Sequence, residues 1–150
     1  MRVFALLLVL SLAFTACGDD DPIAVAQTPL AGQINGEPWV FNSAITDQFL
    51  SDEESVWVVL HAEPVSCGEP EPKGPRLIIK VPREPGAYAF SFTRNMTFVI
   101  PEDTTSMNLV TTSGRLVVES VTEDTVTAAV HGIYDDKNEV DGRFTAPICD

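Results

Sequence analysis

The sequence predicts an all-β fold, an antiparallel sandwich or flattened barrel of about 8–10 strands. After Leu30, apolar residues recur at every second position in most segments, which is the period of a half-buried strand. Clusters of Gly, Pro, Asp and Asn separate these segments about every ten residues. The connections are too short for the crossovers that parallel strands need, so we expect antiparallel pairing.

The first expected strands form a hairpin followed by a buried central strand. Residues 30–34 alternate, and Asn35-Gly36 is the strongest two-residue hairpin signal, because both residues tolerate positive φ. Residues 39–43 return from that turn, with Trp39 in the core. Residues 56–60 are a short, β-branched apolar run, which is typical of a central strand buried on both faces, so Trp57 is also expected in the core.

The second half of the chain continues the pattern. Tyr88, Phe90 and Phe92 alternate with small residues, which places the three aromatic side chains on one face of a strand. The irregular stretch 64–75, with the sequence PVSCGEPEPKGP, cannot form a central strand and should lie on the surface. The other expected strands are 77–81, 97–100, 108–111, 115–121, 125–130 and 140–148.

Composition limits the possible partners. The formal net charge is −13, which argues against nucleic acid and against electrostatic docking on anionic lipid, and favours solubility, cations or basic partners. A hydrophobic content of 45% excludes wholesale disorder. We expect a single all-β domain over residues 30–150, which is long enough to bury a core without a metal.

The first 16 residues have the pattern of a secretory signal peptide. Arg2 precedes an apolar stretch that ends at Phe14, and small residues follow it. As a helix, residues 3–14 would span about 18 Å, too short for a hydrocarbon core of about 30 Å. The segment is therefore expected to target the protein and not to remain as a membrane span.

The end of this leader, Thr15-Ala16-Cys17, resembles the lipobox of bacterial lipoproteins. The resemblance implies that Cys17 is acylated and becomes the first residue of the mature protein. Residues 17–29 then form a tether, whose acidic start at residues 18–22 repels itself and resembles signals for the outer membrane. The implied location is the cell envelope, lipid-anchored at the outer membrane and facing the periplasm or the cell surface.

Two cysteines remain after Cys17. Cys67 and Cys149 form an even pair outside the cytosol, which favours one disulfide closing a loop of about 80 residues. Free thiols or metal ligation are the alternatives, although no Cys-x-x-Cys or paired His supports a metal.

An acidic segment is a candidate calcium site. Asp135, Asp136, Asn138 and Asp141 offer oxygen ligands between two strands, and calcium binds six to eight oxygens. The spacing is not that of an EF-hand, and an acidic hairpin turn explains the same residues.

We expect no enzymatic activity, because no nucleophile or metal-protease motif accompanies the two histidines, His61 and His131. His61 ends an apolar strand beside Glu63, and His131 is expected on the wetter face of its strand. A hydrolase that uses either histidine as a general base is the less favoured alternative. A second alternative is a lipocalin-like carrier of a small apolar ligand, with Tyr88, Phe90 and Phe92 lining its cavity.

Motifs at both ends of the domain resemble small, β-rich bacterial lipoproteins of uncharacterised activity. The first is GQINGEPW at residues 32–39, and the second is GRFTAPIC at residues 142–149. The resemblance implies a fold and an envelope location and carries no activity with it. We therefore expect an anchored binding or structural module whose partner is a protein, a glycan or a small apolar ligand.

Overall fold

The computed structural model describes residues 24–149, and the expected leader, Cys17 and most of the expected tether lie outside this range. The described residues form eleven strands, one more than the upper end of the expected range. The strands are β1 (Ala31–Ile34), β2 (Glu37–Val40), β3 (Ser43–Asp47), β4 (Ser55–His61), β5 (Arg76–Pro82), β6 (Gly86–Ala89), β7 (Met96–Pro101), β8 (Ser106–Thr111), β9 (Ser113–Val121), β10 (Thr125–Asp135) and β11 (Asn138–Pro147).

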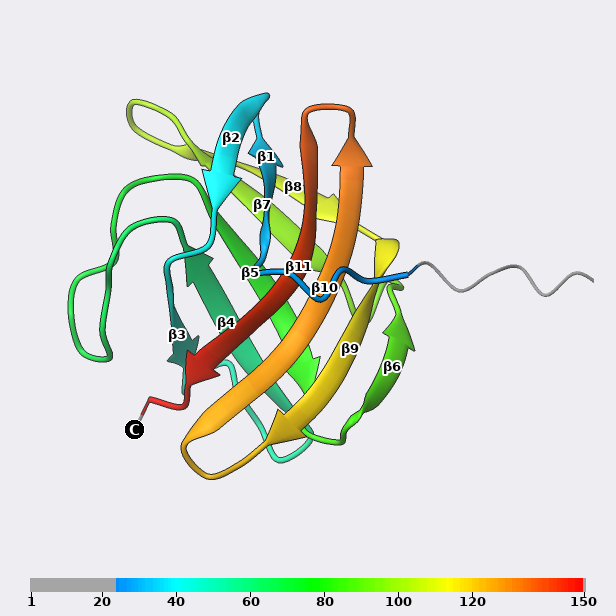
Figure 1. Ribbon diagram of the computed structural model, residues 1–150. Coiled ribbons are helices and arrows are strands. Elements are labelled where there is room, and N and C mark those ends of the chain that lie inside the picture. Colours follow the sequence, from blue (N-terminus) through cyan, green and yellow to red (C-terminus); the bar gives the residue numbers. More distant parts are fainter. Residues whose placement is uncertain (1–23, 150) are drawn as a thin grey trace, which may run out of the picture.

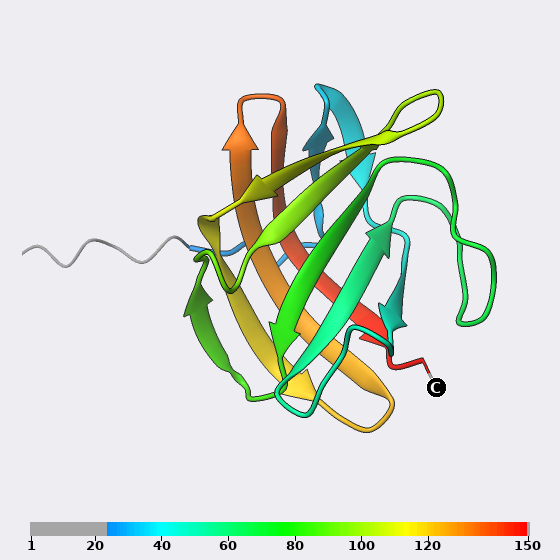
Figure 2. The same cartoon turned by 180° about the vertical axis from the view of Figure 1, so that it is seen from behind.

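Two antiparallel sheets pack face to face, which confirms the predicted sandwich and not the closed barrel (Figures 1 and 2). The six-stranded sheet has the order β2-β1-β11-β10-β9-β6, and the five-stranded sheet has the order β3-β4-β5-β7-β8. The longest hairpin, β10–β11, lies at the centre of the six-stranded sheet. No helix long and apolar enough to cross a bilayer occurs within residues 24–149.

The core lies between the sheets and is built from the alternate positions of each strand. Phe98 is fully buried, and Trp39 and Phe144 are each 3% exposed. Burial of such side chains contributes about 25 cal/mol per Å² of apolar surface, so this layer is the main source of stability. Further fully buried members are Leu30, Val56, Val58, Leu60, Leu77, Ile79, Val81, Met96, Leu116, Val126, Ala128, Val130, Val140 and Ala146.

The chain changes sheets inside the expected strand 39–43, so that part of the prediction was wrong. The Phe41 amide still donates to Leu30 O in the six-stranded sheet (3.0 Å). The next amide, that of Asn42, donates to His61 O in the five-stranded sheet (2.8 Å). One expected strand is therefore two, β2 and β3, and this split adds a strand to the count.

The aromatic alternation at Tyr88 stops earlier than predicted. Phe90 is buried and Tyr88 packs against the core, but Phe92 is 93% exposed. β6 ends at Ala89, and the backbones of Ser91 and Arg94 then pair to close a tight turn that carries Phe92 outward. The three aromatic residues therefore do not share a face.

β4 is buried on both faces, as predicted, but Trp57 is not in the core. Val56 and Val58 point between the sheets, so Trp57 points to the outer face of the five-stranded sheet, where it is half-buried. It pairs there with Asp47 and Lys80. Successive residues of β4 thus face either the core or the outer side of the sheet, and an uninterrupted apolar run does not show which residue faces which side.

Residues 24–30 form a segment, here called the strap, that crosses the outer face of the six-stranded sheet (Figure 1) and ends at Leu30, whose side chain is buried in the core. In Figure 1 it crosses in front of β11 and β10 before it joins β1. It is held by the amides of Leu30 and Arg143, which donate to Arg143 O and Thr28 O. Gly142 makes this approach possible, because its φ is +138° and an added Cβ would lie 2.6 Å from Leu30 Cα.

Candidate functional site

The connection between β4 and β5, residues 62–75, lies over one end of the five-stranded sheet and is here called the cover loop. Ser43, His61 and Arg76 form one row across β3, β4 and β5, on the face away from the core. The Ser43 hydroxyl donates to Glu63 O (2.7 Å) and accepts from the Val65 amide (2.9 Å). The loop therefore contacts the sheet, and its surface position agrees with the prediction.

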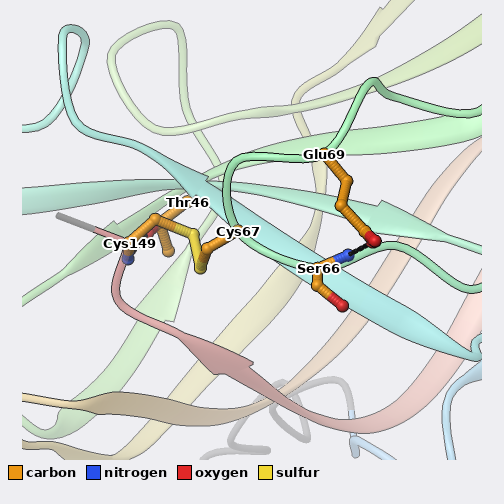
Figure 3. The surroundings of a disulfide bond; sticks show 5 residues. All are labelled: Thr46, Ser66, Cys67, Glu69 and Cys149. Carbon is orange, nitrogen blue, oxygen red and sulfur yellow. Dashed lines mark hydrogen bonds between the residues drawn. A yellow bond between two sulfur atoms is a disulfide. The ribbon is translucent and has the colours of Figure 1, made fainter.

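A disulfide fixes the cover loop to the end of the chain. Cys67 and Cys149 are joined, with their Cα atoms 5.5 Å apart and 82 positions apart in sequence (Figure 3). The Cys149 amide donates to Thr46 Oγ1 of β3 (2.7 Å). Next to Cys67, the Ser66 amide donates to the Glu69 carboxylate (2.8 Å). The loop and the chain end thus form one fastened unit at the β3 edge.

His61 is buried beneath this unit. Its side chain is 2% exposed, and its Nε2 lies 4.0 Å from Glu71 Oε2 of the cover loop without a hydrogen-bond partner. Arg76 Nε lies 3.4 Å from the same carboxylate oxygen. Burial lowers the pKa of His61, Arg76 lowers it further, and Glu71 and Glu63 act in the opposite direction. The neutral imidazole is therefore the favoured form in the folded protein.

One surface cavity adjoins the Cys149 end of the disulfide, and another is lined in part by the cover loop. The first, of about 550 Å³, adjoins Cys149 and includes Asp52, Glu53 and Arg83. The Ser55 hydroxyl and neighbouring backbone amides lower the pKa of Asp52, because they donate hydrogen bonds to its carboxylate. The second, of about 420 Å³, is lined by Glu71, Pro72, Lys73, Arg76 and residues 101–106.

His131 lies in the other sheet, so the structure does not bring the two histidines together. It is in β10, on the outer face opposite the core position Val130, and its side chain is 16% exposed. Its Nε2 lies 3.2 Å from Glu139 Oε1, and its buried Nδ1 has no hydrogen-bond partner. The expected wetter face is therefore partly covered.

The four residues of the candidate calcium site are distributed around the β10–β11 hairpin. Asp135 accepts from the Asn138 side chain (2.8 Å), which lowers the pKa of Asp135. The Asn138 Oδ1 accepts from the Asn35 amide (2.8 Å), and the Asp141 Oδ1 accepts from the strap amide of Ala26 (2.8 Å). Asp136 is in the turn, and its carbonyl accepts from the Gln33 side chain.

These contacts link the β1–β2 hairpin, the β10–β11 hairpin and the strap. Within residues 24–149, no group of three or more His, Cys, Asp or Glu side chains is placed to hold a metal. Asn35 and Gly36 have φ values of 55° and 78°, as the predicted turn requires. The hairpin contacts therefore account for these polar side chains, and calcium binding stays a prediction.

Comparison of the chain with protein family models, with curated proteins and with solved structures finds no match.

Sequence reasoning did not find the partners of His61. It placed Glu63 beside this histidine, whereas Glu71 and Arg76 are the charged groups nearest to it. Glu71 lies ten positions along an irregular loop, and its position depends on how that loop folds back over the sheet. Arg76 had a readable signal, because it begins the strand that pairs with β4.

Proposed function

We propose that this chain is an exported lipoprotein of the cell envelope, anchored through acyl chains on Cys17, and that its sandwich acts as a binding or structural module. The leader that ends in Thr15-Ala16-Cys17 carries this proposal. The disulfide supports it, because such bonds persist in oxidising compartments outside the cytosol. The acidic start of the tether further suggests the outer membrane.

The packed interior favours a binding module over a lipocalin-like carrier. A carrier needs an enclosed apolar cavity of about 300 Å³ or more. Here the inward side chains of both sheets form a single contiguous cluster. The two histidines lie on outer faces of different sheets, so a hydrolase would have to use one of them alone.

The test of the anchor is the variant Cys17→Ser expressed in the native host. We expect the wild type to fractionate with membranes and to incorporate a clickable palmitate analogue, and the variant to lose both properties. Cys149→Ser is the matched control, because it also removes a thiol and should keep the label. Labelling of Cys17→Ser at the wild-type level would contradict the proposal.

The cover loop is the surface that we propose for partner binding. The disulfide holds it in one arrangement, which lowers the entropy cost of binding. Its charged side chains Glu69, Glu71 and Lys73 are exposed, and Glu71 and Lys73 line the second cavity. A photo-crosslinking residue at Glu69 should capture a discrete partner in native membranes, and the same residue at Thr127, on the six-stranded sheet, should not. Equal adducts from both positions would remove this assignment.

A further inference from the structure

The described chain begins at one particular side of the sandwich. The Ala26 amide is bound to Asp141, and the strap runs from there across β10 (Figure 1). Asp141, His131, Arg115 and Ala89 form one row across β11, β10, β9 and β6. The strap therefore points along this row, and in both views it leaves the molecule at the side where β6 ends and β9 begins (Figures 1 and 2).

The most exposed aromatic side chain of the described residues lies at the same side. Phe92 is 93% exposed, at the tip of the turn between β6 and β7. The amide of Phe90, two residues earlier, donates to Gly114 O at the corner between β8 and β9 (3.1 Å). Val110, near the end of β8, is 50% exposed beside the same corner. Two exposed apolar side chains, Phe92 and Val110, thus lie beside the β8–β9 corner, at the side where the strap leaves the molecule (Figure 1).

Two segments at this side lack the acidic residues that dominate the chain. None of the 22 Asp and Glu residues falls in segments 85–101 and 104–118, which supply β6, β7, β8 and the first part of β9. The charged residues of these two segments are Arg94 and Arg115. The turns that connect β6 to β7 and β8 to β9 therefore carry no carboxylate side chains, although the chain has a net charge of −13.

The tether is too short to let the domain turn freely. Ala24 is seven positions after Cys17, and a fully extended chain over that distance spans about 25 Å. β10 alone has 11 residues and is about 36 Å long. If Cys17 is held at a bilayer surface, the side of the sandwich at the strap exit must lie close to that surface.

We propose that the turn Ser91–Arg94 is a second membrane contact, in which Phe92 enters the interface of the bilayer that holds the acyl chains of Cys17. This inference rests on the proposed lipid anchor. Burial of an aromatic side chain is favourable, and the anchor supplies the attachment that one side chain would not. Arg94, whose guanidinium lies 4.6 Å from the Tyr88 ring centroid, adds a cation next to lipid phosphates.

Phe49 provides a natural comparison. It is 91% exposed, in the turn after β3, at the opposite edge of the five-stranded sheet from β8. Its turn holds Asp47, Asp52, Glu53 and Glu54, which an anionic surface repels. The two phenylalanines are therefore equally exposed and differ in the charges around them, which are acidic near Phe49 and not near Phe92.

The experiment uses lipidated protein purified from its native host and reconstituted in vesicles of phosphatidylcholine and phosphatidylglycerol with brominated acyl chains. Phe92→Trp and Phe49→Trp are compared, and wild-type emission from the two native tryptophans is subtracted. We expect the emission added by Phe92→Trp to shift to shorter wavelength and to be quenched by bromine. The emission added by Phe49→Trp should stay unquenched.

Flotation of the vesicles separates the two proposals. If wild-type protein does not float with the vesicles, the lipid anchor fails and the membrane contact fails with it. If the protein floats but Phe92→Trp is quenched no more than Phe49→Trp, the anchor stands and the membrane contact is overturned. Both substitutions are at exposed turn positions, so near-wild-type circular dichroism is expected for each.

Discussion

The strap and the cover loop are two irregular segments that each cross the outer face of one sheet, and different forces hold them. The cover loop is fixed by a covalent bond between Cys67 and Cys149. The strap is held by hydrogen bonds, including those of Ala26 and Leu30. The cover loop supplies the carboxylate neighbour of His61, Glu71, whereas the neighbour of His131 on the strap's face, Glu139, comes from β11. The comparison shows that one fold stabilises its two outer faces in separate ways.

The largest expected difference follows from removal of the disulfide. A cross-link across 82 positions removes unfolded-state entropy worth about 4 kcal/mol on the chain-entropy model. We expect Cys67→Ser/Cys149→Ser to lose about this much in free energy of unfolding, measured by urea denaturation. Reduction of the wild type should give the same loss. Equal denaturation midpoints for the oxidised and reduced protein would show that the cover loop needs no covalent bond.

Two glycines with positive φ test how tightly each segment packs. At Gly142, an added Cβ would meet the strap backbone, whereas nothing lies within 4 Å of such an atom at Gly68 in the cover loop. We expect Gly142→Ala to cost about 3 kcal/mol and Gly68→Ala about 1 kcal/mol of unfolding free energy. Equal costs, measured by thermal or urea unfolding, would mean that the strap moves aside.

The strap's own attachment should be weaker. Asp141→Ala leaves the Ala26 amide without its carboxylate acceptor, a loss of about 1–2 kcal/mol. The expected readout is faster hydrogen exchange at the Ala26 amide and earlier proteolysis within residues 24–30. Asp136→Ala, in the exposed hairpin turn, is the control and should leave both unchanged. Unchanged exchange at Ala26 in Asp141→Ala would contradict this role.

Local sequence patterns predicted the strands of this fold better than the points where the chain changes sheet or leaves a strand. Alternation found most strands, and Asn35-Gly36 found its turn, because each depends on neighbouring residues. The change of sheet between Phe41 and Asn42 left no signal, since each amide finds its acceptor in a distant strand. The aromatic alternation in the sequence extends to Phe92, but the strand that it predicts ends at Ala89.

The candidate site shows the same division. Cysteine counting predicted the pair that the structure joins, because the remainder was two and the expected compartment oxidising. Contact between Glu71 and His61 was not predictable, since it depends on the path of a loop without a period. Sequence reasoning therefore predicted the disulfide that fixes the cover loop and did not predict that the loop lies over His61.

The smallest expected effect is a pH dependence of the folding stability, and it comes from His61 under the cover loop. Because burial lowers the pKa of His61, the folded protein disfavours the proton that the unfolded chain binds near pH 6.5. The stability from neutral His61 should be fully present above about pH 6.5 and be lost as the pH falls below that value toward the lowered pKa. Urea midpoints between about pH 7 and 5 should fall less for His61→Leu than for the wild type. The control is His131→Gln, on the strap's face, whose urea midpoint should fall with pH as the wild type's does. If the midpoint of His61→Leu falls as steeply with pH as that of the wild type, the cover loop does not hold a neutral imidazole.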